Sequence, residues 1–310
     1  MEHAEMIEKL MEKTTLGEEE ARSALEQNGW NLLDALIAEE RAGRLKGKSN
    51  SYRTDEAAPA GKAAEEHEAD GRQDVVWFST DGIERIEIDW VNGNADVALW
   101  DDDRIMLTEE GKRPLAKAEK MCCTVRNGTL RVVYSESGGF FHKARLLTEK
   151  RLTLRLPRTM HPGAITLTGV SADWTVKDVR TDKLRLKTVS GNCTLERVDA
   201  ECLELAATSG RTALMACSVD GSTAIKTVSG SVRCFDCRIG RQISVHSVSG
   251  DVAIELPADA PGFALRFETV SGDVQSSVPT TGTRSQMVCG DGSLAIQVNT
   301  VSGGLTVAKL

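Results

Sequence analysis

The sequence predicts a mainly β protein: a β-solenoid with about 20 residues per coil, preceded by a small three-helix domain and a flexible linker. Three observations predict this fold. A corner motif close to Thr-Val-Ser-Gly recurs in the C-terminal half, short segments of alternating apolar and polar residues surround it, and helical spacing of apolar residues is confined to the N-terminus. The expected domains are residues 1–46, the linker 47–72 and the solenoid 73–310.

The N-terminal segment groups its apolar residues into three short runs at helical spacing. Thr15 stands three residues before Glu18, which is the spacing of a capping box, and Gly43 follows the last run. We expect Trp30 and the Leu and Met side chains to form the small core, because a domain of this size needs nearly every apolar residue inside. Leu16 and Trp30 are also the candidate partner-binding residues, if part of this apolar surface stays exposed.

Residues 47–72 contain one aromatic residue and no Ile, Leu, Val, Phe or Met, which predicts a flexible tether. Residues 1–72 hold 17 acids and 10 bases, a net charge of −7, which leaves 29 acids and 28 bases for the rest. Neither part is basic, so nucleic acid is not an expected partner.

From Val75 onward the apolar pattern has period two, as expected for short strands. The glycines of the corner motif follow one another at spacings of 19, 20, 20, 22 and 31 residues, and the last spacing contains an insertion. A period near 20 with two strands per repeat indicates a β-solenoid. The predicted corner residues are Gly191, Gly210, Gly230, Gly250, Gly272 and Gly303.

Aligned on these glycines, the residues seven and five positions before and two and four positions after are mostly apolar. They should form ladders inside the solenoid, because no single coil can bury its apolar face alone. The glycine should supply unusual backbone dihedrals at the corner, and the small Thr and Ser should supply hydroxyls to the stacked turns.

The segment "LTLRLPRTMHPGAITLTGVSADWTV" and the "TVSGDV" copies resemble the bacterial putative-adhesin family of unknown function, over about residues 75–310. This resemblance implies a β-solenoid without an established enzymatic activity, often linked to envelope stress or membrane-associated systems. The segment "LMEKTTLGEEEARSALEQNGWNLLDALIAEE" resembles ubiquitin-associated-like (UBA-like) three-helix domains, over about residues 5–42. That resemblance implies a protein partner bound through the helical head.

Two acidic residues, Asp251 and Asp273, directly follow corner glycines that are consecutive before the insertion. On adjacent coils their carboxylates would lie about 5 Å apart, which is the separation in retaining glycosidases. A calcium site is another option, but Asp after Gly is also ordinary turn chemistry, and we favour that interpretation.

The cysteines suggest metal binding only weakly, because the Cys234 and Cys237 pair has no second CxxC or nearby His. Cys193 and Cys234 occupy ladder positions and should be buried, and Cys217 and Cys237 should stack on each other. We therefore predict no catalytic residue, no metal site and no cofactor.

The expected function is that of a non-enzymatic scaffold or protein-interaction protein of the bacterial cytoplasm, with the head binding a partner and the solenoid mediating assembly. The N-terminus lacks the pattern of a signal peptide, and no apolar run approaches the length of a transmembrane segment, although a peripheral membrane location stays open. The alternative is an exported or surface carbohydrate-binding or carbohydrate-active β-helix.

The chain stops at "TVSGGLTVAKL", a coil whose residues Ile296, Val298, Leu305 and Val307 would be exposed at an open end. Two covers are conceivable: the insertion 276–293, or a second copy joined end to end. Of these, the homodimer through the terminal coil is favoured.

Overall fold

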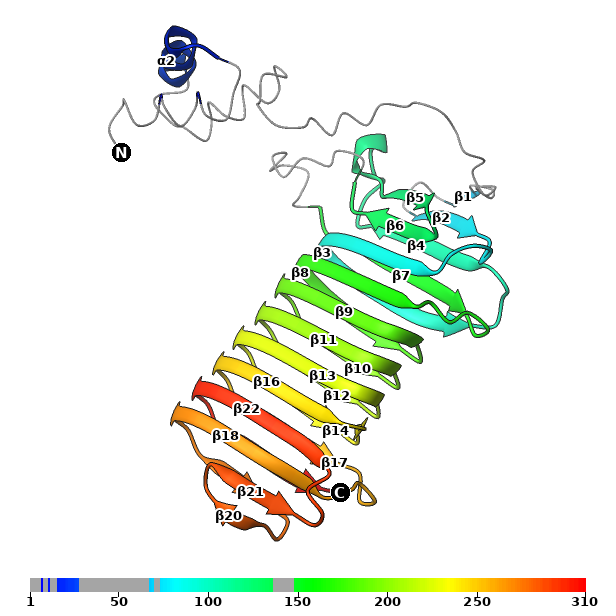
Figure 1. Ribbon diagram of the computed structural model, residues 1–310. Coiled ribbons are helices and arrows are strands. Elements are labelled where there is room, and N and C mark those ends of the chain that lie inside the picture. Colours follow the sequence, from blue (N-terminus) through cyan, green and yellow to red (C-terminus); the bar gives the residue numbers. More distant parts are fainter. Residues whose placement is uncertain (1–6, 8–10, 12–15, 28–66, 70–72, 136–147) are drawn as a thin grey trace. The chain divides into compact units, whose positions relative to one another are not determined.

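The structure is a computed structural model that describes residues 7, 11, 16–27, 67–69, 73–135 and 148–310 (Figure 1). The chain divides into two compact units, Met1–Pro59 and Ala60–Leu310, and each is described by itself below.

In the first unit, helix α2 (Glu18–Gln27) buries Ala21, Ala24 and Leu25 in a small apolar cluster. The backbone N–H of Gly17 donates to the Glu20 carboxylate at 3.0 Å, so the helix is capped at Gly17 and the predicted capping pair was placed too early. Of the other two predicted helices, the structure describes only single residues of the first, and the third lies outside the described residues.

Part of the predicted linker is ordered, because β1 (His67–Ala69) pairs antiparallel with β2 (Gln73–Phe78). The composition of the linker gave no sign of this strand. Pairing at the edge of a sheet uses backbone hydrogen bonds, which need no apolar side chain.

The second unit is a β-solenoid, as predicted, whose coils stack in parallel and in register (Figure 1). Two long strands begin the stack, β3 (Arg85–Trp100) and β8 (Ala164–Lys177), and each crosses a corner to contribute to both main faces. The first face continues in spatial order with β9 (Arg180–Ser190), β11 (Asp199–Ser209), β13 (Ser218–Ser229), β16 (Gln242–Ser249), β22 (Leu294–Ser302) and β18 (Phe263–Ser271). The second face continues with β10 (Cys193–Glu196), β12 (Thr212–Met215), β14 (Val232–Phe235), β17 (Val252–Leu256), β23 (Leu305–Lys309) and β19 (Val274–Ser276).

The spatial order of the coils differs from their order in the chain. Strand β22 pairs with β16 on one side and β18 on the other, and β23 lies in the same way between β17 and β19. The C-terminal coil, residues 294–310, is therefore inserted into the stack. Our expectation that this coil forms an open end, with Val307 exposed, was wrong, since Val307 is fully buried.

The last coil in space contains β18 and β19, and the insertion covers part of it. Strand β21 (Gln286–Cys289) pairs antiparallel with β18, and β20 (Thr281–Thr283) pairs with β21. The insertion is therefore the cover of the first face at this end, which was the alternative that we did not favour. A homodimer stays a prediction, but the expected end-to-end contact through the terminal coil is not available, because β22 and β23 are each paired on both sides.

At the other end of the stack the strands change from parallel to antiparallel pairing. On the side of β3 away from β8, the parallel neighbours are β6 (Thr129–Val133) and β7 (Lys150–Pro157). Antiparallel β5 (Cys122–Arg126) follows on β6, and antiparallel β4 (Ile105–Gly111) follows on β7. Strand β2 then pairs with β4, and a short 3-10 helix, η1 (Lys117–Glu119), connects β4 to β5. We call this region the N-terminal cap.

The six predicted corner glycines stack on one another, but for a broader reason than the predicted one. Only Gly191, Gly210 and Gly250 have a positive φ, at 144°, 113° and 129°. At Gly230, which lacks it, a Cβ would lie 2.0 Å from the carbonyl oxygen of Gly210 on the preceding coil. The shared requirement is thus the close approach of stacked backbones, since a Cβ at each of the six would lie within 2.4 Å of a carbonyl oxygen below it.

This close approach predicts a measurable cost at Gly230. We expect Gly230→Ala to lower the free energy of unfolding by at least about 1 kcal/mol, because the added methyl group displaces the corner of the neighbouring coil. The matched control is Gly304→Ala, where a Cβ would make an ordinary contact at 3.4 Å. Urea unfolding of both variants measures the difference, and equal stability would show that the corners tolerate a side chain.

A second corner repeats without glycine. Asp178, Arg197, Ala216 and Asp236 adopt the left-handed conformation, with φ between 50° and 59°. Their spacing equals the repeat, and each is followed by a buried residue of the core. The sequence marked this corner only weakly, because Arg197 and Ala216 are not residue types that favour the left-handed conformation, although Asp178 and Asp236 are.

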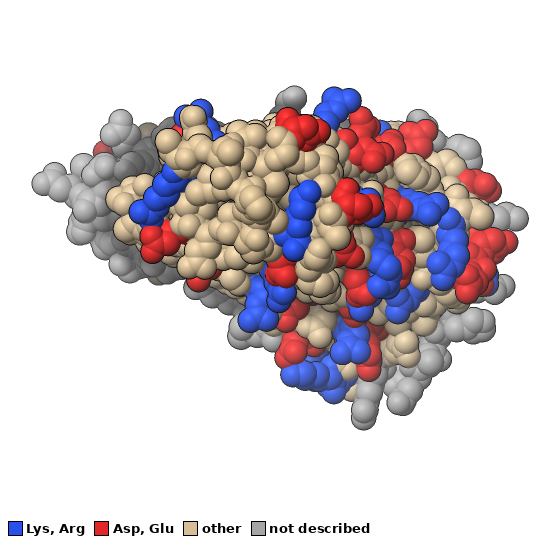
Figure 2. Space-filling view, turned by 90° about the horizontal axis from the view of Figure 1, so that it is seen from below, with Lys and Arg blue, Asp and Glu red and all other residues tan. Residues whose placement is uncertain are grey.

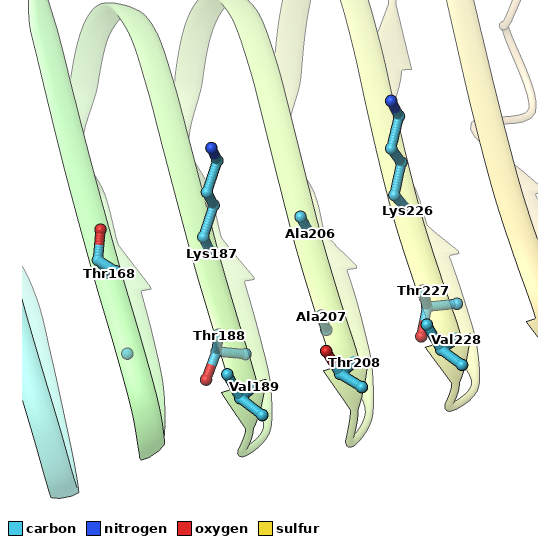
Figure 3. A pocket seen from close by; sticks show the side chains of 11 residues that line it. Thr168, Lys187, Thr188, Val189, Ala206, Ala207, Thr208, Lys226, Thr227 and Val228 are labelled. Carbon is cyan, nitrogen blue, oxygen red and sulfur yellow. The ribbon is translucent and has the colours of Figure 1, made fainter. Parts of the chain in front are cut away.

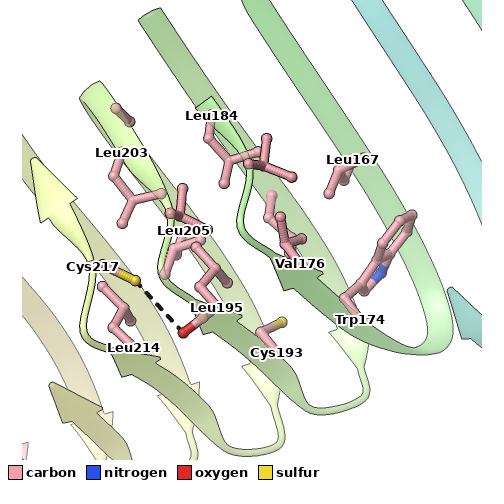
Figure 4. Close-up of a cluster of buried hydrophobic side chains, with 14 of the residues drawn as sticks. Leu167, Trp174, Val176, Leu184, Cys193, Leu195, Leu203, Leu205, Leu214 and Cys217 are labelled. Atoms are coloured by element: carbon pink, nitrogen blue, oxygen red, sulfur yellow. Dashed lines mark hydrogen bonds between the residues drawn. The ribbon is translucent and has the colours of Figure 1, made fainter. Parts of the chain in front are cut away.

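The predicted ladders fill the interior of the solenoid (Figure 4). Cys193 and Cys234 are buried among Leu, Ile and Val, as expected, and the register places Cys217 beside Cys237. The Cys217 thiol donates to the carbonyl oxygen of Leu195 at 3.6 Å (Figure 4), and burial raises the pKa of Cys234 to about 12. All eight cysteines are free thiols.

Candidate functional site

One row of side chains at the glycine corner is apolar and exposed. The valine of each Thr-Val-Ser-Gly copy points outward, while the preceding Thr or Ser is buried, or half-buried in the case of Thr269. Seven stacked positions form what we call the valine stripe, about 29 Å long at a coil spacing of about 4.8 Å. In spatial order these positions are Val170, Val189, Thr208, Val228, Val248, Val301 and Val270.

The valine stripe is exposed to a degree that is unusual for so regular a set of apolar residues. Its valines are between 38% and 83% exposed. Single exposed valines are common on protein surfaces, but a row of stacked exposed valines, interrupted here only at Thr208, marks an interaction surface more often than scattered ones do.

A shallow hollow of about 290 Å³ adjoins the stripe across β8, β9, β11 and β13 (Figure 3). It arises where one coil departs from the repeat: "KTV" on β9 and on β13 is replaced by "AAT", residues 206–208, on β11. The smaller side chains of Ala206 and Ala207 leave space between the two neighbouring coils, and Val189 and Val228 contribute apolar walls.

Two lysines flank this hollow. Lys187 on β9 and Lys226 on β13 occupy the same register position as Ala206, one coil to either side, and both are exposed. Neither ammonium group forms an ion pair with a residue that the structure describes, whereas nearby Glu204 already pairs with Lys183 and Arg185. The hollow therefore combines an apolar floor with two available positive charges.

The inner wall of the hollow carries a buried hydroxyl. Thr227 Oγ1 has no hydrogen-bond partner among the described residues, although Thr188 Oγ1 donates to the carbonyl oxygen of Ser190 at 3.4 Å. The serines of the motif do bridge coils, since Ser209 Oγ and Ser249 Oγ donate to the carbonyl oxygens of Val189 and Val228. The predicted role of the corner hydroxyls is thus confirmed for these serines.

Charged side chains elsewhere on the solenoid are largely paired across adjacent coils. Examples are Lys177 with Glu196 at 3.1 Å and Arg233 with Glu255 at 2.8 Å. Figure 2 shows an area where acidic and basic side chains alternate beside a broad area without charge. Because exposed ion pairs contribute little stability, these pairs chiefly keep the outer faces polar.

The two predicted partner-binding residues do not form a described surface. Leu16 is only 6% exposed and packs in the apolar cluster beside α2, which is the core role expected for most residues of this segment. Trp30 lies outside the described residues. Partner binding through the head therefore stays a prediction.

The pair Asp251 and Asp273 does not form the geometry of a glycosidase. The inserted C-terminal coil lies between them, so they are two coils apart, which is about 9.6 Å rather than 5 Å. Asp251 accepts the backbone N–H of Gly304 at 2.8 Å, and Asp273 pairs with Arg284. Asp173 accepts the N–H of Asn192 in the same way, so turn chemistry explains this position.

A buried polar cluster in the N-terminal cap was not expected from the sequence. Lys150 and Glu109 form an ion pair whose side chains are fully buried. The Lys150 ammonium also donates to the carbonyl oxygens of Glu119, at 2.7 Å, and Tyr134, and it lies 3.8 Å from the centre of the Tyr134 ring. The N–H of Met121 donates to the other oxygen of Glu109 at 2.8 Å.

This cluster has the character of a structural element. Burial lowers the pKa of Lys150 and raises the pKa of Glu109, while the attraction between them acts in the opposite direction. Every proton of the ammonium group has an acceptor, so Lys150 has no free donor for a ligand. A signal was present in the sequence, because the period-two pattern places Lys150 on the same face as Leu152 and Leu154.

The neighbouring Glu119 predicts a pH dependence. Hydrogen bonds from Arg113 and from the N–H of Ala116 lower its pKa from 4.5 to about 2. A depressed carboxylate pKa stabilises the fold above pH 4.5, and that contribution disappears as the pH falls toward 2. We expect Glu119→Gln to be less stable than the wild type at pH 6, with a difference that shrinks at pH 4 and 3 in urea unfolding. A difference in the free energy of unfolding that stays constant from pH 6 to pH 3 would show that the lowered pKa of Glu119 is not its cause.

Among the described residues, no group of three or more His, Cys, Asp or Glu side chains is arranged to hold a metal ion. The described part of the chain also contains no helix with the length and hydrophobicity needed to cross a bilayer.

Comparison with solved structures finds similarities to several bacterial proteins. A putative cell adhesion protein from Clostridium sporogenes is 11% identical, with 77% of this chain and 99% of that chain covered and a TM-score of 0.39. A putative adhesin from Bacteroides fragilis is 12% identical, with coverages of 77% and 97% and a TM-score of 0.39. A putative lipid binding protein from Parabacteroides distasonis is 14% identical, with coverages of 76% and 97% and a TM-score of 0.42. At such TM-scores these likenesses carry no argument about function.

No curated protein matches the chain. The Toastrack DUF4097 family model matches it twice, over residues 83–211 and 160–308, which together span the solenoid. Both matches begin after the helical segment, so they give no support to the UBA-like resemblance of residues 5–42. The chain belongs to the Toastrack DUF4097 family.

Proposed function

We propose that this protein is a non-enzymatic protein-interaction protein whose solenoid presents the valine stripe as a rigid binding edge. The observation that carries the proposal is the exposure of seven stacked corner positions, six of them valine, on a scaffold whose inward-facing apolar residues are buried in one continuous core. A partner that covers this row gains the burial of apolar surface, at about 25 cal/mol per Å², without ordering the stripe, because in-register strands already hold it.

The helical head is the second binding module of this proposal, joined to the solenoid through a polar segment. The experiment that tests whether the head and the valine stripe bind different partners uses three proteins. It compares the partners captured by the full chain, by a chain lacking residues 1–59, and by a full chain with Val228→Lys and Val248→Lys. The proposal requires that the lysine variants lose partners that the head deletion retains. Identical capture by the wild type and the lysine variants would overturn it.

One observation favours a second candidate, a surface protein that binds carbohydrate. Trp77 and Trp100 stack at 5.3 Å in the N-terminal cap, with the Arg104 guanidinium 4.3 Å from the centre of the Trp77 ring, and both indoles are partly exposed. Aromatic faces beside polar groups suit sugar rings. Detection of the protein outside the cell, together with glycan binding that Trp100→Ala abolishes, would favour this candidate.

The expected link to envelope stress stays a prediction.

A further inference from the structure

We propose that the hollow beside Ala206 and the adjoining valine stripe bind an acidic amphipathic helix of a protein partner, with Lys187 and Lys226 pairing with carboxylates on that helix. This inference rests on the proposed function and names the chemistry of its partner. Four observations carry it: the local departure from the repeat, the apolar row, the two lysines and the spacing of the coils.

Charge selects an acidic partner. Lys187 and Lys226 lie on either side of the hollow, and neither pairs with a described carboxylate. Glu204, two residues before Ala206 on the same strand, is already held by Lys183 and Arg185. A basic segment would bring like charges together at the hollow, whereas an acidic segment would pair with both lysines.

The apolar surface requires a partner that carries apolar side chains next to its carboxylates. Val189 and Val228 are 50% and 48% exposed, and the methyl groups of Ala206 and Ala207 form the floor between them. A hollow of about 290 Å³ can receive one large side chain, such as Leu or Phe, from a partner that lies across it. A free inorganic anion would use the lysines and leave this apolar surface uncovered.

Spacing selects a helix over a strand. The coils of the solenoid are about 4.8 Å apart, and one turn of an α-helix rises about 5.4 Å. Side chains on one face of a helix that lies along the stripe therefore fall out of step with the coils by only about 2 Å over three coils. Same-face residues of an extended strand are about 6.7 Å apart, which gives a drift of about 6 Å over the same length. Lys187 and Lys226, two coils apart at about 9.6 Å, match carboxylates seven residues apart on a helix, at about 10.5 Å.

The test uses the full chain and a labelled synthetic helix of 18 residues, with one Leu per turn on one face and two Glu seven residues apart beside it. The matched control peptide has Lys in place of these two Glu. We expect saturable binding of the acidic peptide by fluorescence anisotropy, weakened at least about tenfold by Lys187→Glu with Lys226→Glu. That double variant should in turn bind the control peptide more tightly than the wild type does.

A filling variant separates the hollow from general charge effects. Ala206→Phe should weaken the binding of the acidic peptide at least about tenfold, because the phenyl ring occupies the space that a side chain of the peptide needs. Ala253→Phe, on the outward side of the second face, is the matched control and should bind as the wild type does. Far-UV circular dichroism of each variant confirms that it is folded.

Several results would overturn the inference: no binding of the acidic peptide, equal binding of both peptides, or an unchanged affinity in Ala206→Phe. The inference would also be overturned in favour of a different occupant if the protein does not bind the peptide but instead binds anionic lipid vesicles or self-associates, and Ala206→Phe abolishes that binding or self-association. If Val228→Lys and Val248→Lys still lose captured partners while the peptide fails to bind, the inference of a helical partner is wrong and the proposed function stands.

Discussion

Lys150→Met is expected to lower the free energy of unfolding by about 3–5 kcal/mol, because it leaves the Glu109 carboxylate buried without its counter-ion. The carbonyl oxygens of Glu119 and Tyr134 would lose their donor as well. Urea unfolding followed by circular dichroism measures the change.

The double variant Glu109→Leu with Lys150→Met distinguishes a buried pair from two independent groups. Removing both charges should cost less than the sum of the single changes, because no unpaired charge remains in the N-terminal cap. Arg131→Met is the control, since its ion pair with Asp89 is about half exposed and should contribute less than about 1 kcal/mol. Additive losses, or a loss for Lys150→Met as small as that of Arg131→Met, would contradict the burial of this pair.

Val307→Lys is expected to be the second large effect, with a loss of at least about 3 kcal/mol or failure to fold. Val307 is fully buried and lies between Ile254 and Ser276 in the stack, so a lysine there places a charge between two coils.

The neighbouring residue provides the control. Thr306 points outward from the same strand and is exposed, so Thr306→Lys should be nearly neutral. If Val307→Lys were as stable as Thr306→Lys, the C-terminal coil would lie at an exposed end of the array and the strand order would be wrong.

The repeat period, the corner glycines and the apolar ladders could be predicted from the sequence because each coil repeats the same local pattern. The order of the coils could not. All coils offer nearly the same apolar residues to their neighbours. The pattern therefore allows the C-terminal coil to lie either after the coil that contains Gly272 or between the coils that contain Gly250 and Gly272. The insertion decides the order, because β21 pairs with β18 and occupies the side of that strand where a following coil would lie.

The candidate site was missed for a different reason. At a corner, two consecutive residues can be exposed, so strict alternation does not tell which residue of Thr-Val-Ser is inside, and the structure places Thr inside and Val outside. The signal for the hollow was the change from "KTV" to "AAT" at residues 206–208, which breaks an otherwise regular copy. The signal for the buried pair was a charged residue at an inward position of the period-two pattern, at Glu109 and at Lys150.

The most direct test of the account is site-specific photo-crosslinking of the full-length protein in the cell. A photoreactive amino acid replaces Val228 on the valine stripe or, as the control, Thr306 on the outward side of the second face. The account predicts discrete protein adducts from position 228 that are absent from position 306. Adducts that are equal at the two positions, or found only at 306, would contradict the claim that the valine stripe is the binding edge of this protein.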